Sequence, residues 1–179
     1  MDDLFHDTML WPVRVFLPKR VGWSLWGGNM PNARDFLLPV WSRYALFDTA
    51  EGLCDYLRRD RTTHVLSRTF GWESLRHGLR GRMPDVSDVA DFRFDRFAGW
   101  SPRYEGGGLV SCLDLIRDLG DQFDDRLLIN FSRPGGALRH LYDVLWGEAE
   151  RVVKPERVAK AAQQAVARLE ILAKWNPRT

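Results

Sequence analysis

A stretch of alternating apolar and polar residues near the start of the chain constrains the fold more than any other feature. The residues at every second position from 11 to 17 are apolar: Trp11, Val13, Val15 and Leu17. The alternation resumes over Val21–Trp26 after a short Pro-Lys-Arg break. This pattern predicts a strand, a tight turn and a second strand, and Arg43–Phe47 is predicted to form a third.

Farther along the chain the apolar period changes from two to three and four, which is typical of helices packed on one side. The predicted helices cover residues 49–59, 72–79, 109–123, 137–147 and 155–175. The fold class is therefore α+β, with a small, mostly antiparallel N-terminal sheet packed by C-terminal helices. Asp48 and Glu51 have the spacing of a capping box before the first helix. Phe92, Phe94 and Phe97 suggest a further short strand.

The length of 179 residues predicts a single domain over 1–179. At this size folding buries roughly 70% of the chain's surface, so a core can form without disulfides or metals. We expect residues 1–9 to be flexible and residues 155–175 to form one long C-terminal helix.

The chain contains eight tryptophans, an unusually large supply of aromatic surface. Trp11, Trp23 and Trp146 coincide with predicted core positions. Trp26, Trp41 and Trp175 fall outside the predicted core stripes, and these three are therefore candidates for a contact surface.

Charge is distributed unevenly along the chain, although the net charge is only +2. Residues 58–82 are rich in arginine and residues 85–125 are rich in aspartate. Four aspartates share one helical stripe: Asp114, Asp118, Asp121 and Asp125. We interpret this row as a solvated face, with docking of arginines or binding of cations as alternatives. The small net charge does not by itself imply a nucleic-acid or membrane partner.

The residue types that hold metals and cofactors are scattered. Cys54 and Cys112 lie inside apolar patterns without a CxxC spacing, which indicates reduced core thiols and a cytoplasmic location. The four histidines fall on separate predicted elements, and no phosphate-binding loop or nucleophile motif occurs. We expect no cofactor, no metal site and no catalytic residue. No signal peptide or apolar run of spanning length is seen, so no membrane partner is expected.

Several segments of the first 80 residues resemble a known family. They are Leu17-Pro18, Val21–Leu25, Tyr44–Leu53 and Trp72–Leu75. Together they are similar to small actinobacterial proteins of unestablished function that are often labelled primosomal proteins. The resemblance implies an actinobacterial cytoplasmic protein associated with nucleic-acid metabolism. Its motifs are structural, so it transfers no active site.

Three functional hypotheses follow from these patterns. The first is a non-catalytic binding protein that engages a macromolecular partner, most simply another protein. The second is a nucleic-acid-associated accessory protein that uses the arginine-rich segment. The third is an enzyme of unidentified class, and the oligomeric state stays open. The candidate binding residues are Trp26, Trp41, Arg58, Arg59, Arg61, Arg68, Trp72 and Arg76.

Overall fold

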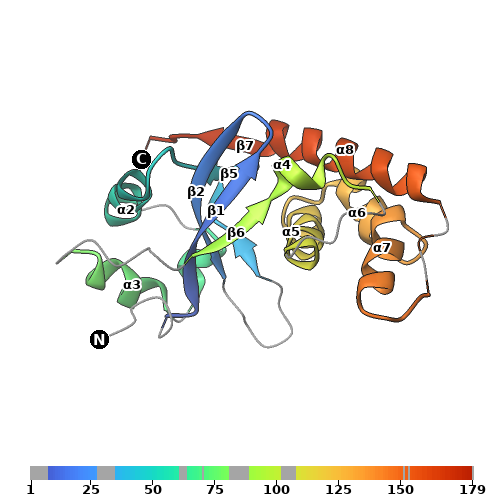
Figure 1. The fold of residues 1–179 in the computed structure, drawn as a ribbon. Helices are drawn as coiled ribbons and strands as arrows, with labels where there is room; N and C mark the ends of the chain where they lie inside the picture. Colours follow the sequence, from blue (N-terminus) through green and yellow to red (C-terminus); the bar gives the residue numbers. More distant parts are fainter. Residues whose placement is uncertain are drawn as a thin grey trace. The chain divides into compact units, whose positions relative to one another are not determined.

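The computed structural model shows the predicted α+β class with mostly antiparallel strands, which form two small sheets rather than one (Figure 1). It describes residues 8–27, 35–60, 64–69, 71–80, 89–101, 108–150, 152 and 154–178. Residue contacts divide the chain into two compact units. The first contains residues 1–15, 21–91 and 173–179, and the second contains 16–20 and 92–172. The single domain stays a prediction, and most of the segment expected to be flexible, 1–9, lies outside the described residues.

The larger sheet is built on the predicted N-terminal hairpin. Its strands are β1 (Leu10–Leu17), β2 (Arg20–Gly27), β3 (Phe36–Leu37) and β6 (Ala90–Arg93), in the order β3-β2-β1-β6. Residues 18 and 19 form the turn between β1 and β2. Val13, Val15 and Leu17 are buried on one face of β1, as the alternation predicts, whereas Trp11 is half-buried.

The smaller sheet joins the end of the chain to its first third. Its strands are β4 (Pro39–Val40), β5 (Arg43–Leu46) and β7 (Ala173–Trp175), in the order β4-β5-β7. β7 pairs with β5 in parallel, with Leu46 opposite Trp175. The helix predicted for 155–175 therefore ends at Leu172. Residues 173–175 exchange backbone hydrogen bonds with a strand some 130 residues away in sequence, a partner that local periodicity does not reveal.

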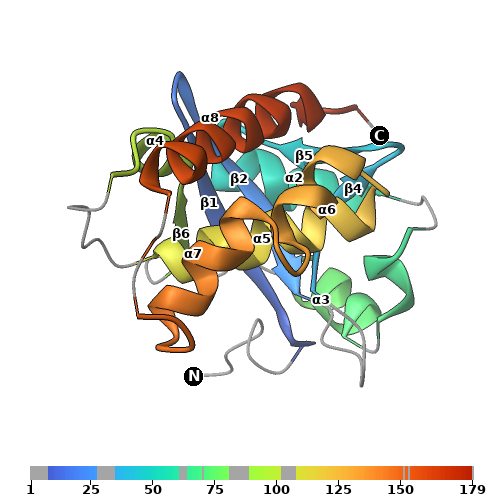
Figure 2. The ribbon, with the colours of Figure 1, turned by 90° about the vertical axis from the view of Figure 1, so that its right-hand side faces the viewer.

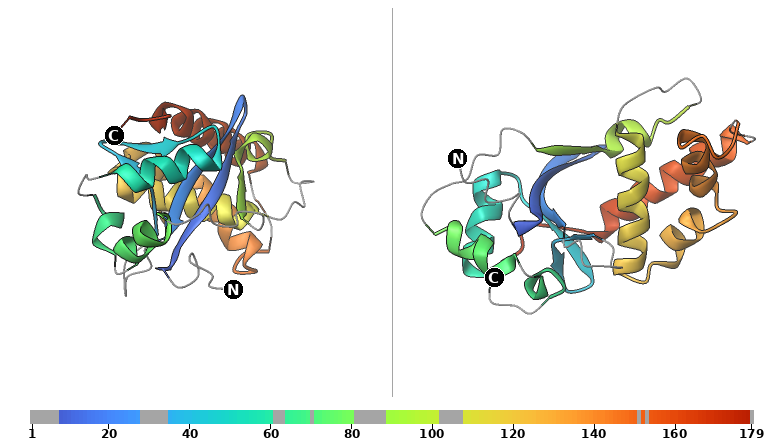
Figure 3. Two further views of the ribbon diagram at one scale, coloured as in Figure 1. Left: turned by 90° about the vertical axis from the view of Figure 1, so that its left-hand side faces the viewer. Right: turned by 90° about the horizontal axis from the view of Figure 1, so that it is seen from below.

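The first unit also contains α2 (Ala50–Arg59), the short 3-10 helix η1 (Leu66–Arg68) and α3 (Trp72–Gly78). Thr49 caps α2, since its hydroxyl accepts a hydrogen bond from the backbone N–H of Gly52 at 3.0 Å. The predicted cap, Asp48, instead accepts a hydrogen bond from the side-chain amide of Asn176 at 2.7 Å. α2 and α3 lie on the same side of the larger sheet (Figure 3). Their buried leucines and Trp72 form one core cluster with Leu10 and Leu25.

The second unit is helical. Its elements are α4 (Phe94–Phe97), α5 (Leu109–Gln122), α6 (Arg126–Ser132), α7 (Ala137–Leu145) and α8 (Pro155–Leu172). Figure 2 shows α5, α6 and α7 as neighbours, with α8 crossing them. The short strand suggested by Phe92, Phe94 and Phe97 contains only Phe92, because the chain enters α4 at Phe94. Periodicity did not reveal α6, which has only seven residues.

Candidate functional site

The indole of Trp41 is the most exposed of the large apolar side chains that the structure describes, with 89% of its surface accessible. It lies at the tip of the β4-β5 hairpin, where Val40 pairs with Arg43 and only Trp41 and Ser42 form the turn. Trp41 has a φ of 55°, in the left-handed region that two-residue hairpin turns require. Asn and Gly adopt this conformation readily, whereas a bulky side chain rarely does. The fold therefore places a large aromatic group where a small or polar residue would be expected.

The strand that follows this turn is firmly held. Tyr44, Ala45 and Leu46 of β5 have no accessible surface, and the backbone N–H of Ala45 donates to the carbonyl of Leu38 at 2.8 Å. Trp41, Ser42 and Arg43 are all exposed, and we call these three residues the Trp41 tip. Within the described residues, Arg43 has no ion pair. The tip thus presents an indole and a guanidinium to solvent from a rigid support.

The other two tryptophans singled out from the sequence are packed against neighbouring side chains. Trp26 is half-buried, and its ring centroid lies 6.0 Å from that of Trp11. Trp175 is also half-buried, with its ring against Gly22, where an added Cβ would lie 2.8 Å from the ring. Trp146, which was expected in the core, is 60% exposed because α7 ends one residue before it. Trp41 alone of the three candidates is largely exposed.

The arginine-rich segment does not form one continuous surface within the described residues. Nε of Arg58 donates to the carbonyl of Leu79 at 2.6 Å, and its Nη1 contacts Asp55 at 2.6 Å, so this side chain braces α2. Arg59 is 71% exposed, and Arg68 is also exposed. Arg61 lies outside the described residues. Nη2 of Arg59 lies 3.8 Å from a carboxylate oxygen of Asp55, so among these described positions Arg68 has the least engaged exposed guanidinium.

Trp72 and Arg76 must be withdrawn from the candidate surface, because both are buried. Their exposed fractions are 2% and 7%. They share one stripe of α3 with Leu75 and Leu79, at intervals of three and four, and that stripe faces the core. Arg76 contacts Glu73 at 3.3 Å through Nη1, while its Nε and Nη2 have no hydrogen-bond partner among the described residues. The position of Arg76 on the apolar stripe was visible in the sequence and could have predicted its burial.

A buried Asp-His pair that sequence patterns did not reveal lies beside Trp72, with the ring centroids of His64 and Trp72 4.7 Å apart. Nε2 of His64 is 2.9 Å from a carboxylate oxygen of Asp60, and the two side chains are 8% and 0% exposed. Nδ1 of His64 accepts a hydrogen bond from the backbone N–H of Ser67 at 3.1 Å, so Nε2 carries the proton and donates to Asp60. The hydroxyl of Ser67 donates to the backbone carbonyl of His64 rather than to the ring. The pair therefore ties this part of the chain together without activating a nucleophile.

In the second unit, the aspartate row on α5 is only partly solvated. Asp118 is 4% exposed and lies 3.2 Å from Nη2 of Arg117. Asp125 is 6% exposed, caps α6 through the backbone N–H groups of Leu127 and Leu128, and contacts Nε of Arg168 at 2.6 Å. The interpretation of the row as a solvated face is wrong for these two aspartates. Arg117 and Arg168 neutralise these two buried carboxylates.

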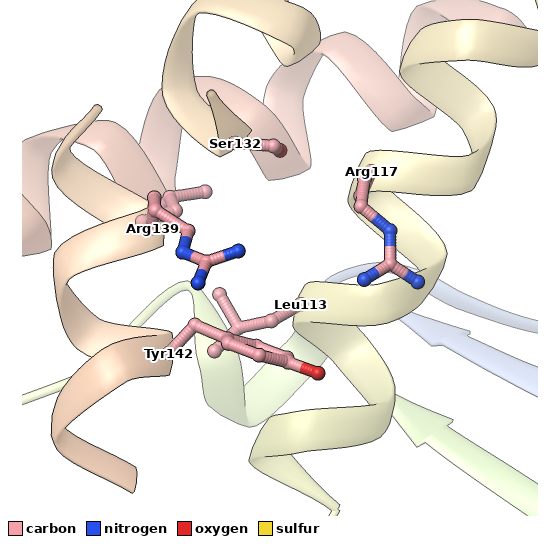
Figure 4. Close-up of a pocket in the computed structure, with 6 residues that line it drawn as sticks. Leu113, Arg117, Ser132, Arg139 and Tyr142 are labelled. Carbon is pink, nitrogen blue, oxygen red and sulfur yellow. The ribbon is translucent and has the colours of Figure 1, made fainter. Parts of the chain in front are cut away.

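A narrow pocket lies between α5, α6 and α7, with Arg117 and Arg139 on opposite sides and Tyr142 between them (Figure 4). Its volume is about 20 Å³, which is room for about one water molecule. Arg139 contacts Asp143 at 2.6 Å, and Arg117 contacts Asp114 at 3.0 Å. Burial raises the pKa of Asp114 against the opposing effect of Arg117. The guanidinium groups are therefore neutralised within the fold, and the pocket is too small for an organic ligand.

Comparisons with known proteins bear on the fold alone. The chain matches no protein-family model and no curated protein. Its architecture is that of a solved α+β domain. That structure is described as "The crystal structure of SatS c-terminal domain in complex with bromine"; it aligns over 98% of both chains with a TM-score of 0.75 and 17% sequence identity. At this identity the similarity establishes a shared fold.

The described residues contain neither a membrane-spanning helix nor a cluster of metal ligands. None of the described helices has the length and apolar character needed to cross a membrane. Nor do three or more His, Cys, Asp or Glu side chains converge there as a metal site.

Proposed function

We propose that this chain is a non-catalytic binding protein that engages a macromolecular partner, and that the Trp41 tip is its contact centre. One observation carries the proposal: an indole that is 89% exposed at the end of a hairpin whose second strand is buried. Trp and Arg are the residue types most enriched among the energetically dominant residues of protein interfaces. The Trp41 tip presents one of each, side by side.

The conformation of Trp41 strengthens this proposal. A left-handed backbone costs a residue with a bulky side chain about 1 kcal/mol or more, and an exposed indole gains little from folding. Asn adopts a positive φ more readily than a bulky residue does, so it lowers that cost. A tryptophan at this position therefore reduces the stability of the isolated chain, and burial of its ring by a partner offsets the loss.

A protein is the partner class that we favour over a nucleic acid. The nucleic-acid hypothesis uses the arginine-rich segment, and the burial of Trp72 leaves one aromatic ring fewer on which a base could stack beside it. We also propose a cytoplasmic location and kinship with the actinobacterial proteins labelled primosomal. Both proposals rest on the sequence patterns of the first 80 residues and on the two buried free thiols.

The experiment is quantitative affinity capture from the native cell, with and without nuclease, using wild type and Trp41→Asn. Asn suits the turn, so the free energy of unfolding should stay constant or rise by up to about 1 kcal/mol. Trp146→Ala, which removes an exposed indole from the second unit, is the matched control. We expect a nuclease-resistant protein partner that Trp41→Asn releases and Trp146→Ala retains.

The partner identified in this way is then titrated as a purified protein. Trp41→Asn should raise its Kd at least about tenfold, as loss of a central interface residue does. Equal retention by wild type and Trp41→Asn would refute the role of the tip. If nuclease treatment abolished the capture of every protein, the result would instead support association with nucleic acid.

A further inference from the structure

The second unit contains an open cavity of about 580 Å³ that is separate from the Trp41 tip and from the pocket of Figure 4. Its walls are the end of α6, the connection from α6 to α7, and the first half of α8. Figure 2 shows α6, α7 and α8 in one group. Small-molecule sites in proteins typically have volumes of about 300 to 1,000 Å³, so the cavity is large enough for an organic ligand.

The polar residues that line the cavity come from one face of α8 and from the turn between α6 and α7. Arg157, Lys160 and Gln164 are three and four residues apart, so they project from one face of α8. Opposite them, Arg133 begins the turn into α7. Gly135 has a φ of +81° in this turn, a left-handed conformation that favours glycine. A Cβ at position 135 would meet no atom within 4 Å, so this part of the turn is open.

The charged residues that line this cavity within the described part of the chain are all basic. Arg133, Arg157 and Lys160 line it, and no carboxylate does so among the residues that the structure describes. Within the described part of the chain, none of these three cations forms an ion pair. Other arginines of the same helices behave differently, since Arg139 contacts Asp143 at 2.6 Å and Arg168 contacts Asp125 at 2.6 Å. The fold therefore pairs Arg139 and Arg168 with carboxylates, while it leaves three cations without an ion pair around one hollow.

The remaining lining groups define the ligand further. Asn130 and Gln164 add neutral amides, whereas Phe131 and Pro134 add apolar surface. α7 begins beside the cavity, and its cap, Gly136, has no side chain to satisfy the first backbone N–H groups. A single inorganic anion would fill a small part of the volume and reach few of the cations.

We propose that this cavity binds a small organic polyphosphate, with Arg133, Arg157 and Lys160 holding the phosphoryl oxygens and the apolar wall contacting the organic part. Arginine pairs well with phosphate because its planar guanidinium donates two parallel hydrogen bonds. This site is independent of the Trp41 tip, and either proposal can fail without the other.

Calorimetric titration of the full chain with ATP, pyrophosphate and citrate tests the proposal, with a single-stranded oligonucleotide as a fourth titrant. We expect saturable binding of ATP at one site, with a Kd of about 1 mM or tighter, and weaker binding of pyrophosphate and citrate. Arg157→Gln combined with Lys160→Gln should raise the Kd for ATP at least about tenfold. Arg133→Gln, from the opposite wall, should have an effect in the same direction.

The matched control is Arg126→Gln combined with Lys154→Gln, which removes the same charge from exposed positions outside the cavity. Circular dichroism of every variant establishes that it is folded. Absence of saturable ATP binding overturns the proposal, as does equal weakening by the cavity and control variants, which indicates unspecific charge attraction. Tighter binding of the oligonucleotide with the same sensitivity to the cavity variants also overturns it, in favour of a nucleic-acid surface.

Discussion

Replacing Asp125 by alanine should destabilise the chain by roughly 2 to 3 kcal/mol, because this one buried carboxylate has two roles. It caps α6 by accepting hydrogen bonds from the backbone N–H groups of Leu127 and Leu128 at 3.1 and 3.2 Å. Removing an aspartate cap costs about 1 kcal/mol. It also accepts a hydrogen bond from Nε of Arg168 at 2.6 Å, with side-chain exposures of 5% for Asp125 and 36% for Arg168. Because water partly solvates Arg168, we assign about 1 to 2 kcal/mol to this charged hydrogen bond.

Asp125→Asn separates the two roles. Asparagine caps helices as well as aspartate does, so this variant should lose only the charged contact, about 1 to 2 kcal/mol. Asp124→Asn is the matched control: its side chain is exposed, its φ of 48° suits asparagine, and its cost should stay within about 0.5 kcal/mol. Urea denaturation followed by circular dichroism measures all three free energies of unfolding.

Arg168→Met completes a double-mutant cycle with Asp125→Asn, and we expect a coupling energy of about 1 kcal/mol. Equal losses of unfolding free energy in Asp125→Ala and Asp125→Asn would show that Asp125 does not stabilise α6 as a cap, and would refute the two assigned roles. A coupling energy near zero would also refute them, because it would show that the Asp125–Arg168 ion pair does not stabilise the fold.

Three further predictions concern buried groups. Burial raises the pKa of Cys112 from 9.0 to about 12. The stability that its protonated thiol contributes is therefore complete below pH 9 and is lost as the pH rises toward 12. Iodoacetamide at pH 8 should label this thiol only after unfolding, and rapid labelling of the native chain would contradict the prediction. Gly22→Ala brings a Cβ to 2.8 Å from the Trp175 ring and should cost about 1 to 3 kcal/mol, so an unchanged Tm would count against that packing. His64→Ala deprives the buried carboxylate of Asp60 of a donor and should cost about 2 kcal/mol in urea denaturation; a loss below about 0.5 kcal/mol would argue against the hydrogen bond.

Local sequence was sufficient for the elements whose apolar pattern is long and regular. The N-terminal hairpin, α2, α3 and α5 appear where periodicity predicts them, because each buries one face against a core and that face has a fixed period. The start of α8 at Pro155 also follows from local chemistry, since proline suits the first turn of a helix. Seven-residue α6 is too short to show a reliable period.

The candidate sites were predicted less well than the elements. The exclusion of Trp41 from the apolar stripes correctly indicated an exposed ring, since the β4-β5 turn is a local feature. The arginine-rich segment was misleading, because a count of charges does not say which side of a helix faces the core. Arg76 lies on the apolar side of α3 and is buried, whereas Arg59 lies on the outer side of α2 and is exposed.

Periodicity and turn chemistry therefore specify the α+β class and most helix positions, since both depend on residues that are close in sequence. Only the tertiary structure could decide the remaining features. The strand Ala173–Trp175 forms because its backbone groups pair with β5, far away in sequence. Asp125 can stay charged while buried because Arg168, from another helix, pairs with it, and the cations of the open cavity come from separate parts of the second unit. Each of these features depends on groups that meet only after the chain has folded.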